Sequence, residues 1–184
     1  MKTVLGVLAA VGLSVAAFGQ SADFTKVVQT GSAAEVQAAI DAGANAKLAD
    51  RIGLTPLAYA ARFNADPSVL TVLLKAGADV DAREPILGVT PLMLAAAWNR
   101  NVDVVATLLR AHAAPDLRDK NGRTALIWGA WHGTNSDVIK ALLDGGADAS
   151  IKDASGRTAL DYAKSNRSLR NSSAIASLSA PSTK

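Results

Sequence analysis

TPLAYAA at residues 55–61 is the stretch that decides the fold, because variants of it occur three more times along the chain. TPLMLAA occupies residues 90–96, TALIWGA residues 124–130 and TALDYAK residues 158–164, so the leading threonines are 35, 34 and 34 residues apart. A fixed period near 34 residues indicates an array of stacked structural units, and it has to be recognised before any site is considered.

Each unit is expected to form two helices. Thr55 can accept a backbone N–H at the start of the first helix, and the proline after it suits a first helical position, where no N–H is needed. Asp66 begins the second helix in the same way. Gly77 ends it, because glycine adopts the left-handed conformation at low cost. His112 stands at the equivalent position one unit later, and histidine tolerates a positive φ better than a branched residue does.

The composition agrees with packed helices. The 184 residues are 49% hydrophobic and 19% charged, which excludes a disordered chain, and only 4% are aromatic, which disfavours a β-sandwich. The absence of cysteine excludes disulfides, cysteine nucleophiles and thiolate metal sites. The net charge of +3 is spread along the chain, so no nucleic-acid partner is expected. A helix pair this small cannot bury its faces alone, and we expect Leu108 and Leu142 between neighbouring units.

The repeated TPL segments and the LLKAGADVDAR stretch at residues 73–83 resemble ankyrin repeats, from residue 22 to about residue 180. The resemblance implies an all-α ankyrin-repeat solenoid of stacked helix pairs with β-hairpin-like loops, and a role in binding proteins. The histidine that usually follows Thr-Pro-Leu is absent, so looser loop bases are expected. The positions concerned are Ala58, Met93, Ile127 and Asp161.

Five units fit the repeat domain, which we place at residues 20–180. The terminal units lack part of the pattern and are interpreted as caps. The expected parts are an N-terminal cap at about 22–49 with helices near 22–30 and 33–42, full repeats at about 50–83, 84–118 and 119–152, a C-terminal cap at about 153–180, and a tail at 181–184.

Residues 1–19 are typical of a signal peptide. Lys2 supplies a positive charge, and the sixteen residues from Thr3 to Phe18 carry no charge, which is short for a membrane span of about 20 residues. Ala17-Phe18-Gly19 places small residues at the −3 and −1 positions of a cleavage site. The sequence therefore predicts an exported protein of bacterial type, periplasmic or secreted, with no membrane span after cleavage.

Candidate catalytic groups are sparse. His112 and His132 lack partners at metal-binding spacing, and no Gly-x-Ser-x-Gly motif occurs. Asp50, Asp119 and Asp153 recur one unit apart and are interpreted as loop caps rather than paired catalytic acids. We expect no enzyme activity, cofactor or metal; a hydrolase using His132 is a remote alternative.

Residues that differ from unit to unit are the candidate partner-binding set, because stacking does not explain them. They lie at the loop tips and at the ends of the first helices, the positions that usually contact partners in ankyrin repeats. We expect Trp98 and Trp131 side by side, Ile86 and Leu87 as the opposite wall, and Arg123 as a charged rim. Alternatively, the aromatic residues fill gaps between neighbouring units. The full set is Arg51, Ile52, Leu54, Arg62, Phe63, Ile86, Leu87, Val89, Trp98, Lys120, Asn121, Arg123, Trp131 and His132.

These observations favour a monomeric, exported module for protein–protein interaction that acts as an adaptor or protector of another exported protein. An inhibitor or immunity protein that blocks an enzyme is the alternative. The identity of the protein partner does not follow from the sequence.

Signal-peptidase cleavage after Gly19 is expected to leave Gln20 as the mature N-terminus. N-terminal sequencing of the periplasmic or secreted fraction measures this directly. Recovery of a chain that still begins at Met1, in a membrane fraction, would contradict the prediction.

Overall fold

Ten helices arranged in five successive pairs occupy residues 21–180, the part of the chain that this computed structural model describes. The expected signal peptide at 1–19 and the tail at 181–184 lie outside these residues. No helix within 21–180 is long and apolar enough to cross a membrane. The pairs are α2 (Ser21–Thr30) with α3 (Ala33–Asp41), α4 (Pro56–Phe63) with α5 (Pro67–Lys75), α6 (Pro91–Trp98) with α7 (Val102–Arg110), α8 (Ala125–His132) with α9 (Ser136–Asp144), and α10 (Ala159–Ser165) with α11 (Ser173–Ser179).

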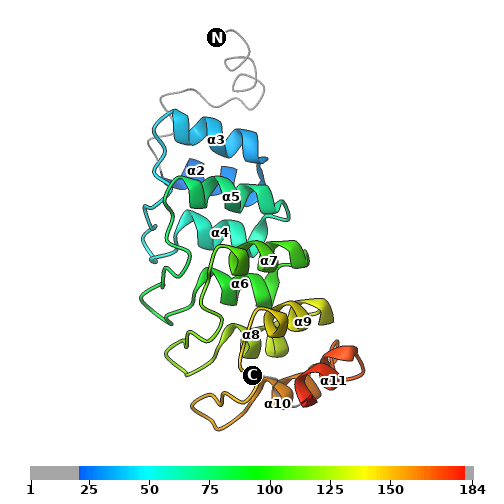
Figure 1. Cartoon of the computed structure of the whole chain (residues 1–184). Helices are drawn as coiled ribbons and strands as arrows, with labels where there is room; N and C mark the ends of the chain where they lie inside the picture. The colour runs from blue at the N-terminus through cyan, green and yellow to red at the C-terminus, as the bar shows by residue number, and fades with distance from the viewer. Residues whose placement is uncertain (1–20, 181–184) are drawn as a thin grey trace.

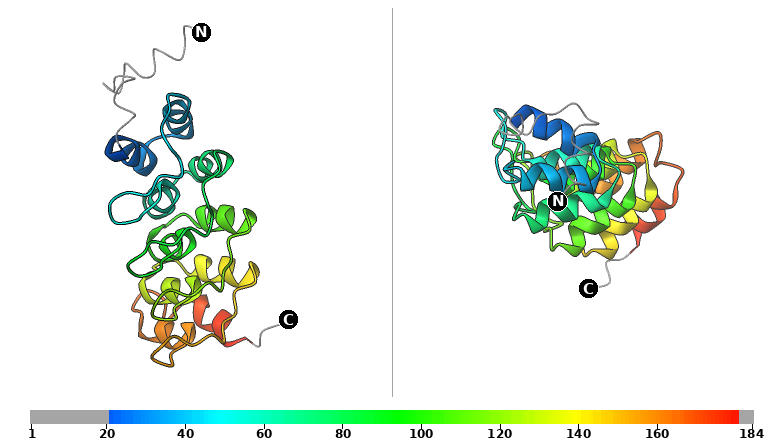
Figure 2. Two further views of the ribbon diagram at one scale, coloured as in Figure 1. Left: turned by 90° about the vertical axis from the view of Figure 1, so that its left-hand side faces the viewer. Right: turned by 90° about the horizontal axis from the view of Figure 1, so that it is seen from above.

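The pairs stack into a two-layered solenoid, as the fold prediction required. The first helices of the pairs contact one another in order, from α2 to α10, and the second helices do the same from α3 to α11. Figure 2 shows these two sets as two columns. The connecting loops all project from one side of the stack (Figure 1). No strand occurs within residues 21–180, so the loops resemble β-hairpins without forming a sheet.

The repeated threonines begin the first helices, as predicted. The side chain of each threonine accepts the backbone N–H three residues later, at 3.2 Å for Thr55, 3.3 Å for Thr90, and 3.4 Å for both Thr124 and Thr158. The threonine satisfies a donor that has no partner inside the helix, and this contact explains why the motif recurs at each first helix from α4 onward.

The second helices of the first four pairs are followed by a residue with a positive φ. Gly77 has a φ of 85°, and His112, its counterpart after α7, has a φ of 64°. The predicted exchange of glycine for histidine is therefore confirmed. His112 is the only residue other than glycine with a positive φ in the described chain.

Small residues let the first helices approach closely. Ala60, Ala61, Ala95 and Ala96 are buried between neighbouring units. Gly129 also faces the preceding unit, because a Cβ added to it would lie 3.4 Å from the Ala96 carbonyl oxygen, at van der Waals contact distance. The buried leucines of the second helices complete the core, and Leu108 and Leu142 are among the fully buried ones.

Buried asparagines join successive units at the turn between the two helices of a pair. The Asn64 side-chain amide donates to the carbonyls of Val28 and Gly31 in the preceding unit, at 3.0 and 2.9 Å. The Asn99 amide reaches back in the same way to Ala61 and Asn64, at 2.9 and 2.8 Å. The stack therefore has polar as well as apolar contacts between units.

The loop bases are tied by a contact that replaces the missing histidine, so the expectation of looser bases is wrong. The Tyr59 hydroxyl donates to Asp50 at 2.6 Å, and the Trp128 indole N–H donates to Asp119 at 3.1 Å. Tyr162 makes the same contact with Asp153. In each case an aromatic residue four positions after the threonine anchors an acid at the start of the loop.

The loop between α5 and α6 is closed differently. Its acid is Glu84 rather than aspartate, and Leu94 stands where the other units have an aromatic residue. The buried Glu84 carboxylate accepts backbone N–H groups of its own loop, from Ile86 at 2.8 Å and from Leu87. The longer glutamate side chain thus spans a loop that contains one more residue.

Replacing Leu108 or Leu142 by alanine is expected to cost about 2–5 kcal/mol of unfolding free energy, because both leucines are fully buried between units. Leu48→Ala is the matched control, since Leu48 is 57% exposed and its loss should change the midpoint little. Denaturant unfolding followed by circular dichroism measures all three. Equal midpoints for the core variants and the control would contradict the stacked core.

Candidate functional site

The predicted site residues divide into an exposed group and a buried group. Phe63, Trp98 and Trp131 are 51%, 45% and 40% exposed, which is unusual for large apolar side chains. Ile52, Ile86 and Leu87 are also exposed at the loop tips, and so are Arg51, Lys120 and Asn121.

Five predicted residues do not belong to the exposed group: Leu54, Arg62, Val89, Arg123 and His132. Val89 is only 6% exposed and is part of the hydrophobic core, because it lies at the base of its loop rather than at the tip. Leu54 is half-buried against the same core. Leu48, which is not one of the predicted residues, is exposed in the loop between α3 and α4.

Aromatic residues form a series across four units, which we call the aromatic row; Phe63, Trp98 and Trp131 are its exposed members, whereas Trp128 and Tyr162 are buried. Its rings approach one another along the ends of the first helices, from α4 to α10. The Trp98 ring stacks on His132 with centroids 4.9 Å apart, and Trp131 lies 4.2 Å from His132 on the same helix. The members of the row are Tyr59, Phe63, Trp98, Trp128, Trp131, His132 and Tyr162.

Arginine side chains bridge or cover the rings of the row. The Arg62 guanidinium carbon lies 4.8 Å from the Phe63 ring centre and 5.3 Å from that of Trp98, so it joins two units. The guanidinium carbon of Arg123 lies 4.8 Å from the Trp128 ring and 5.0 Å from the Trp131 ring. Such cation–π contacts hold the aromatic faces in fixed positions.

The expected arrangement of this surface needs two corrections. Trp98 and Trp131 are not paired directly, because His132 lies between their rings. Arg123 is not a free charged rim, since its side chain is only 11% exposed and pairs with Asp119 at 2.8 Å. The alternative that the aromatic residues fill gaps between units holds in part: they contact the neighbouring unit and still expose a large share of their surface.

The loops are joined to one another by cationic side chains. Arg83 donates to the Arg118 carbonyl at 2.9 Å, and Arg118 donates to the Lys152 carbonyl at 2.6 Å. Lys120 donates in the opposite direction, to the Pro85 carbonyl. A carbonyl oxygen accepts a hydrogen bond but carries no net charge, so each of these contacts leaves a positive charge on the loop edge.

Two of the acids at the loop bases, Asp50 and Asp153, have a lowered pKa. Burial raises the pKa of Asp50, but hydrogen bonds from Tyr59 and from backbone N–H groups outweigh it, so the pKa lies below the usual value. The pKa of Asp153 is lowered for the same reasons. Burial and the hydrogen bond to Asp50 raise the pKa of Tyr59 to about 12. These shifts belong to structural contacts and do not produce a general acid or base.

His132 has no catalytic surroundings. Its imidazole is enclosed by Trp98, Trp128 and Trp131, and within residues 21–180 it makes no hydrogen bond to a serine or a carboxylate. Burial and the positive charge of Arg123 lower its pKa below 6.5. The described chain also contains no group of three acidic, histidine or cysteine residues that could hold a metal ion.

Comparison with known proteins identifies the repeat. The family model described as ankyrin repeats (3 copies) matches residues 62–153 and 92–178, which together span most of the described chain. A search of curated proteins found no match.

The low pKa of His132 predicts a pH dependence of stability. The folded state keeps the imidazole neutral, whereas the unfolded chain protonates it near pH 6.5. This contribution to stability is therefore complete above pH 6.5 and is lost as the pH falls toward the folded-state pKa. We expect the melting temperature to drop less between pH 7.5 and 5.5 for His132→Gln than for the wild type.

His112→Asn is the control, because His112 is exposed and asparagine tolerates its positive φ. This control should lose as much stability over the same interval as the wild type. An equal drop for His132→Gln and the wild type would show that His132 does not titrate differently in the folded state.

Proposed function

Because the chain belongs to the ankyrin-repeat family, whose members are protein–protein interaction modules, we propose that it binds another protein through the aromatic row and the adjacent loop edge. The observation that carries the proposal is the aromatic row itself, in which Phe63, Trp98 and Trp131 remain 51%, 45% and 40% exposed. Tryptophan and arginine are the residues that most often dominate binding energy at protein interfaces.

The rings are already ordered before any partner binds. His132 and Arg62 hold Trp98 from two neighbouring units, and Arg123 covers Trp131. A surface that is fixed in advance loses little conformational entropy on binding, and more of the contact energy therefore appears as affinity.

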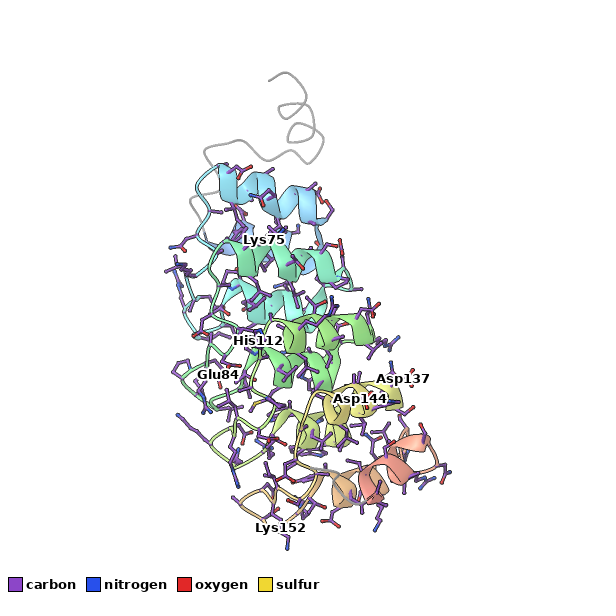
Figure 3. The ribbon with its side chains drawn as sticks, viewed as in Figure 1. Lys75, Glu84, His112, Asp137, Asp144 and Lys152 are labelled. Atoms are coloured by element: carbon purple, nitrogen blue, oxygen red, sulfur yellow. The ribbon has the colours of Figure 1, made fainter. Side chains whose placement is uncertain are left out.

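The charge of the loop edge favours an acidic partner. All seven exposed charged side chains in loop segments 47–54, 83–89, 118–123 and 152–157 are basic, whereas the acids in these segments are bound to loop backbone. Figure 3 places Lys152 among the loops and Asp137 and Asp144 on α9, away from them. The seven are Lys47, Arg51, Arg83, Arg118, Lys120, Lys152 and Arg157.

Export is part of the proposal and rests on residues 1–19. The apolar run followed by Ala17-Phe18-Gly19 supports delivery to the periplasm or the medium, where the module would act as an adaptor or protector of another exported protein. Inhibition of an enzyme by the same surface is the second candidate. An active enzyme in the isolated complex favours the adaptor, and a silent enzyme favours the inhibitor.

Affinity capture tests the binding surface. Proteins retained from an envelope extract by the wild type should be lost when Trp98→Ala and Trp131→Ala are combined, because truncating a central aromatic anchor costs about 2 kcal/mol or more, roughly 30-fold in affinity. The matched control is Lys75→Ala, since Lys75 is exposed on α5 outside the aromatic row and should leave capture unchanged. Raised salt should weaken capture by the wild type.

The fold of the tryptophan variant must be checked by its unfolding midpoint. A variant that stays folded and still retains the same proteins would place the interface elsewhere. A variant that loses its cooperative unfolding would make the tryptophans inter-repeat filler rather than binding residues.

A further inference from the structure

The asparagine that joins successive units is missing at one junction. Asn64, Asn99 and Asn166 each follow the last residue of a first helix, and each donates its side-chain amide to carbonyls of the preceding unit. Gly133 takes this position after α8. The junction between the α6–α7 pair and the α8–α9 pair therefore lacks a carboxamide at this helix-end position. Asn135, two residues further on, does cross the junction, but its side-chain amide donates to the Arg100 carbonyl at 3.3 Å and not to the carbonyls that the helix-end asparagine reaches elsewhere.

A notch of about 160 Å³ lies at this junction. The end of α6, the turn after α8 and the start of α9 enclose it. Its rim includes Trp98 and His132, which stack on each other, and Thr134, Arg100 and Val138 complete much of its wall. A cavity of about 150 Å³ can hold a small organic molecule, so the notch has room for an amide-sized group.

The notch presents carbonyl oxygens in place of a side chain. At the other junctions, the asparagine donates to two carbonyls of the preceding unit: that of the residue directly after the first helix and that of the residue three positions earlier. The equivalent carbonyls at this junction belong to Asn99 and Ala96, and both residues line the notch. A Cβ added to Gly133 would lie 3.2 Å from the Ala96 oxygen, so this oxygen faces the vacant position. Within residues 21–180 no hydrogen bond to either oxygen is found.

We propose that this notch binds a primary carboxamide, the –CO–NH₂ group of a small amide or of an asparagine or glutamine side chain. Such a group supplies the two N–H donors that the equivalent carbonyls receive at the other junctions. Its apolar stem would contact the parts of Trp98 and His132 that line the notch.

The local charges favour a neutral donor over a cation. Arg100 lines the notch, and the Arg62 guanidinium lies 5.3 Å from the Trp98 ring centre. No acidic residue is among those that line it. An ammonium or guanidinium group would therefore meet positive charge without compensation, whereas a carboxamide offers the same donors without charge.

Nuclear magnetic resonance titration of the mature chain with acetamide tests the site. Saturable shifts are expected at the Trp98 indole and at the amides of Asn99 and Thr134. N,N-dimethylacetamide keeps the carbonyl but has no N–H donor, and it should shift these signals at least ten-fold less at the same concentration. Equal effects of the two compounds, or no saturable shift, would leave only water in the notch and overturn the proposal.

Gly133→Asn supplies the carboxamide from the chain itself and should abolish the acetamide shifts. The added Cβ would lie 2.3 Å from the Gly129 oxygen, so the turn has to relax toward the φ of −82° and ψ of 133° that Asn99 adopts. If this variant does not fold, the comparison of the two compounds still decides the question.

Two matched peptides separate the sources of the carboxamide, and only this arm rests on the proposed function. They are acetyl-Ala-Gln-Ala-N-methylamide and the same peptide with methionine in place of glutamine. At least ten-fold tighter binding of the glutamine peptide than of acetamide assigns the notch to a partner's side chain, and equal binding assigns it to a small amide. Acetamide binding together with loss of all protein capture would reject the proposed function alone.

Discussion

The close contact between successive first helices is the constraint on which the rest of the molecule depends. These helices approach one another because the facing positions hold alanine or glycine, and a Cβ added to Gly129 would already be in van der Waals contact with Ala96. No unit can bury its apolar face without its neighbour, so the first helices stack with their ends aligned. The aromatic row is a consequence of that alignment, because side chains at one repeat position come within contact distance.

The helices and their ends could be predicted from the sequence because local chemistry determines them. The threonine caps and the left-handed residue at His112 act over four residues or fewer, and the same pattern recurs with a period near 34. The contacts between units could not be derived in this way. Val89, like Leu54, is expected at a loop tip because it departs from the repeat pattern. Only the closure of the loop, in which the Glu84 N–H donates to the Val89 carbonyl, shows that Val89 lies at the base and is buried.

The sequence indicated which residues could form the candidate surface, but not how their side chains are arranged. Departure from the repeat pattern drew attention to Trp98, Trp131 and His132, but the order of their rings depends on rotamers that spacing does not encode. The asparagine bridges were missed for another reason. Asparagine in a turn is ordinary, and its recurrence at residues 64, 99 and 166 gains meaning only when the preceding unit is seen to present carbonyls to it.

The loop between α5 and α6, which Glu84 closes, restricts which parts of the repeats can be exchanged by recombination. In the other loops, an aspartate at the loop base accepts a hydrogen bond from an aromatic residue nine positions later. Glu84 instead accepts from backbone N–H groups of its own loop, and Leu94 has no polar group to donate. A recombination event that placed the Glu84 loop before α4 or α8 would leave Tyr59 or Trp128 without its aspartate acceptor. The reverse exchange would place an aspartate before Leu94, where it keeps its backbone donors but lacks the aromatic one. For the loop that contains Glu84, the loop and its following helix therefore form one heritable module.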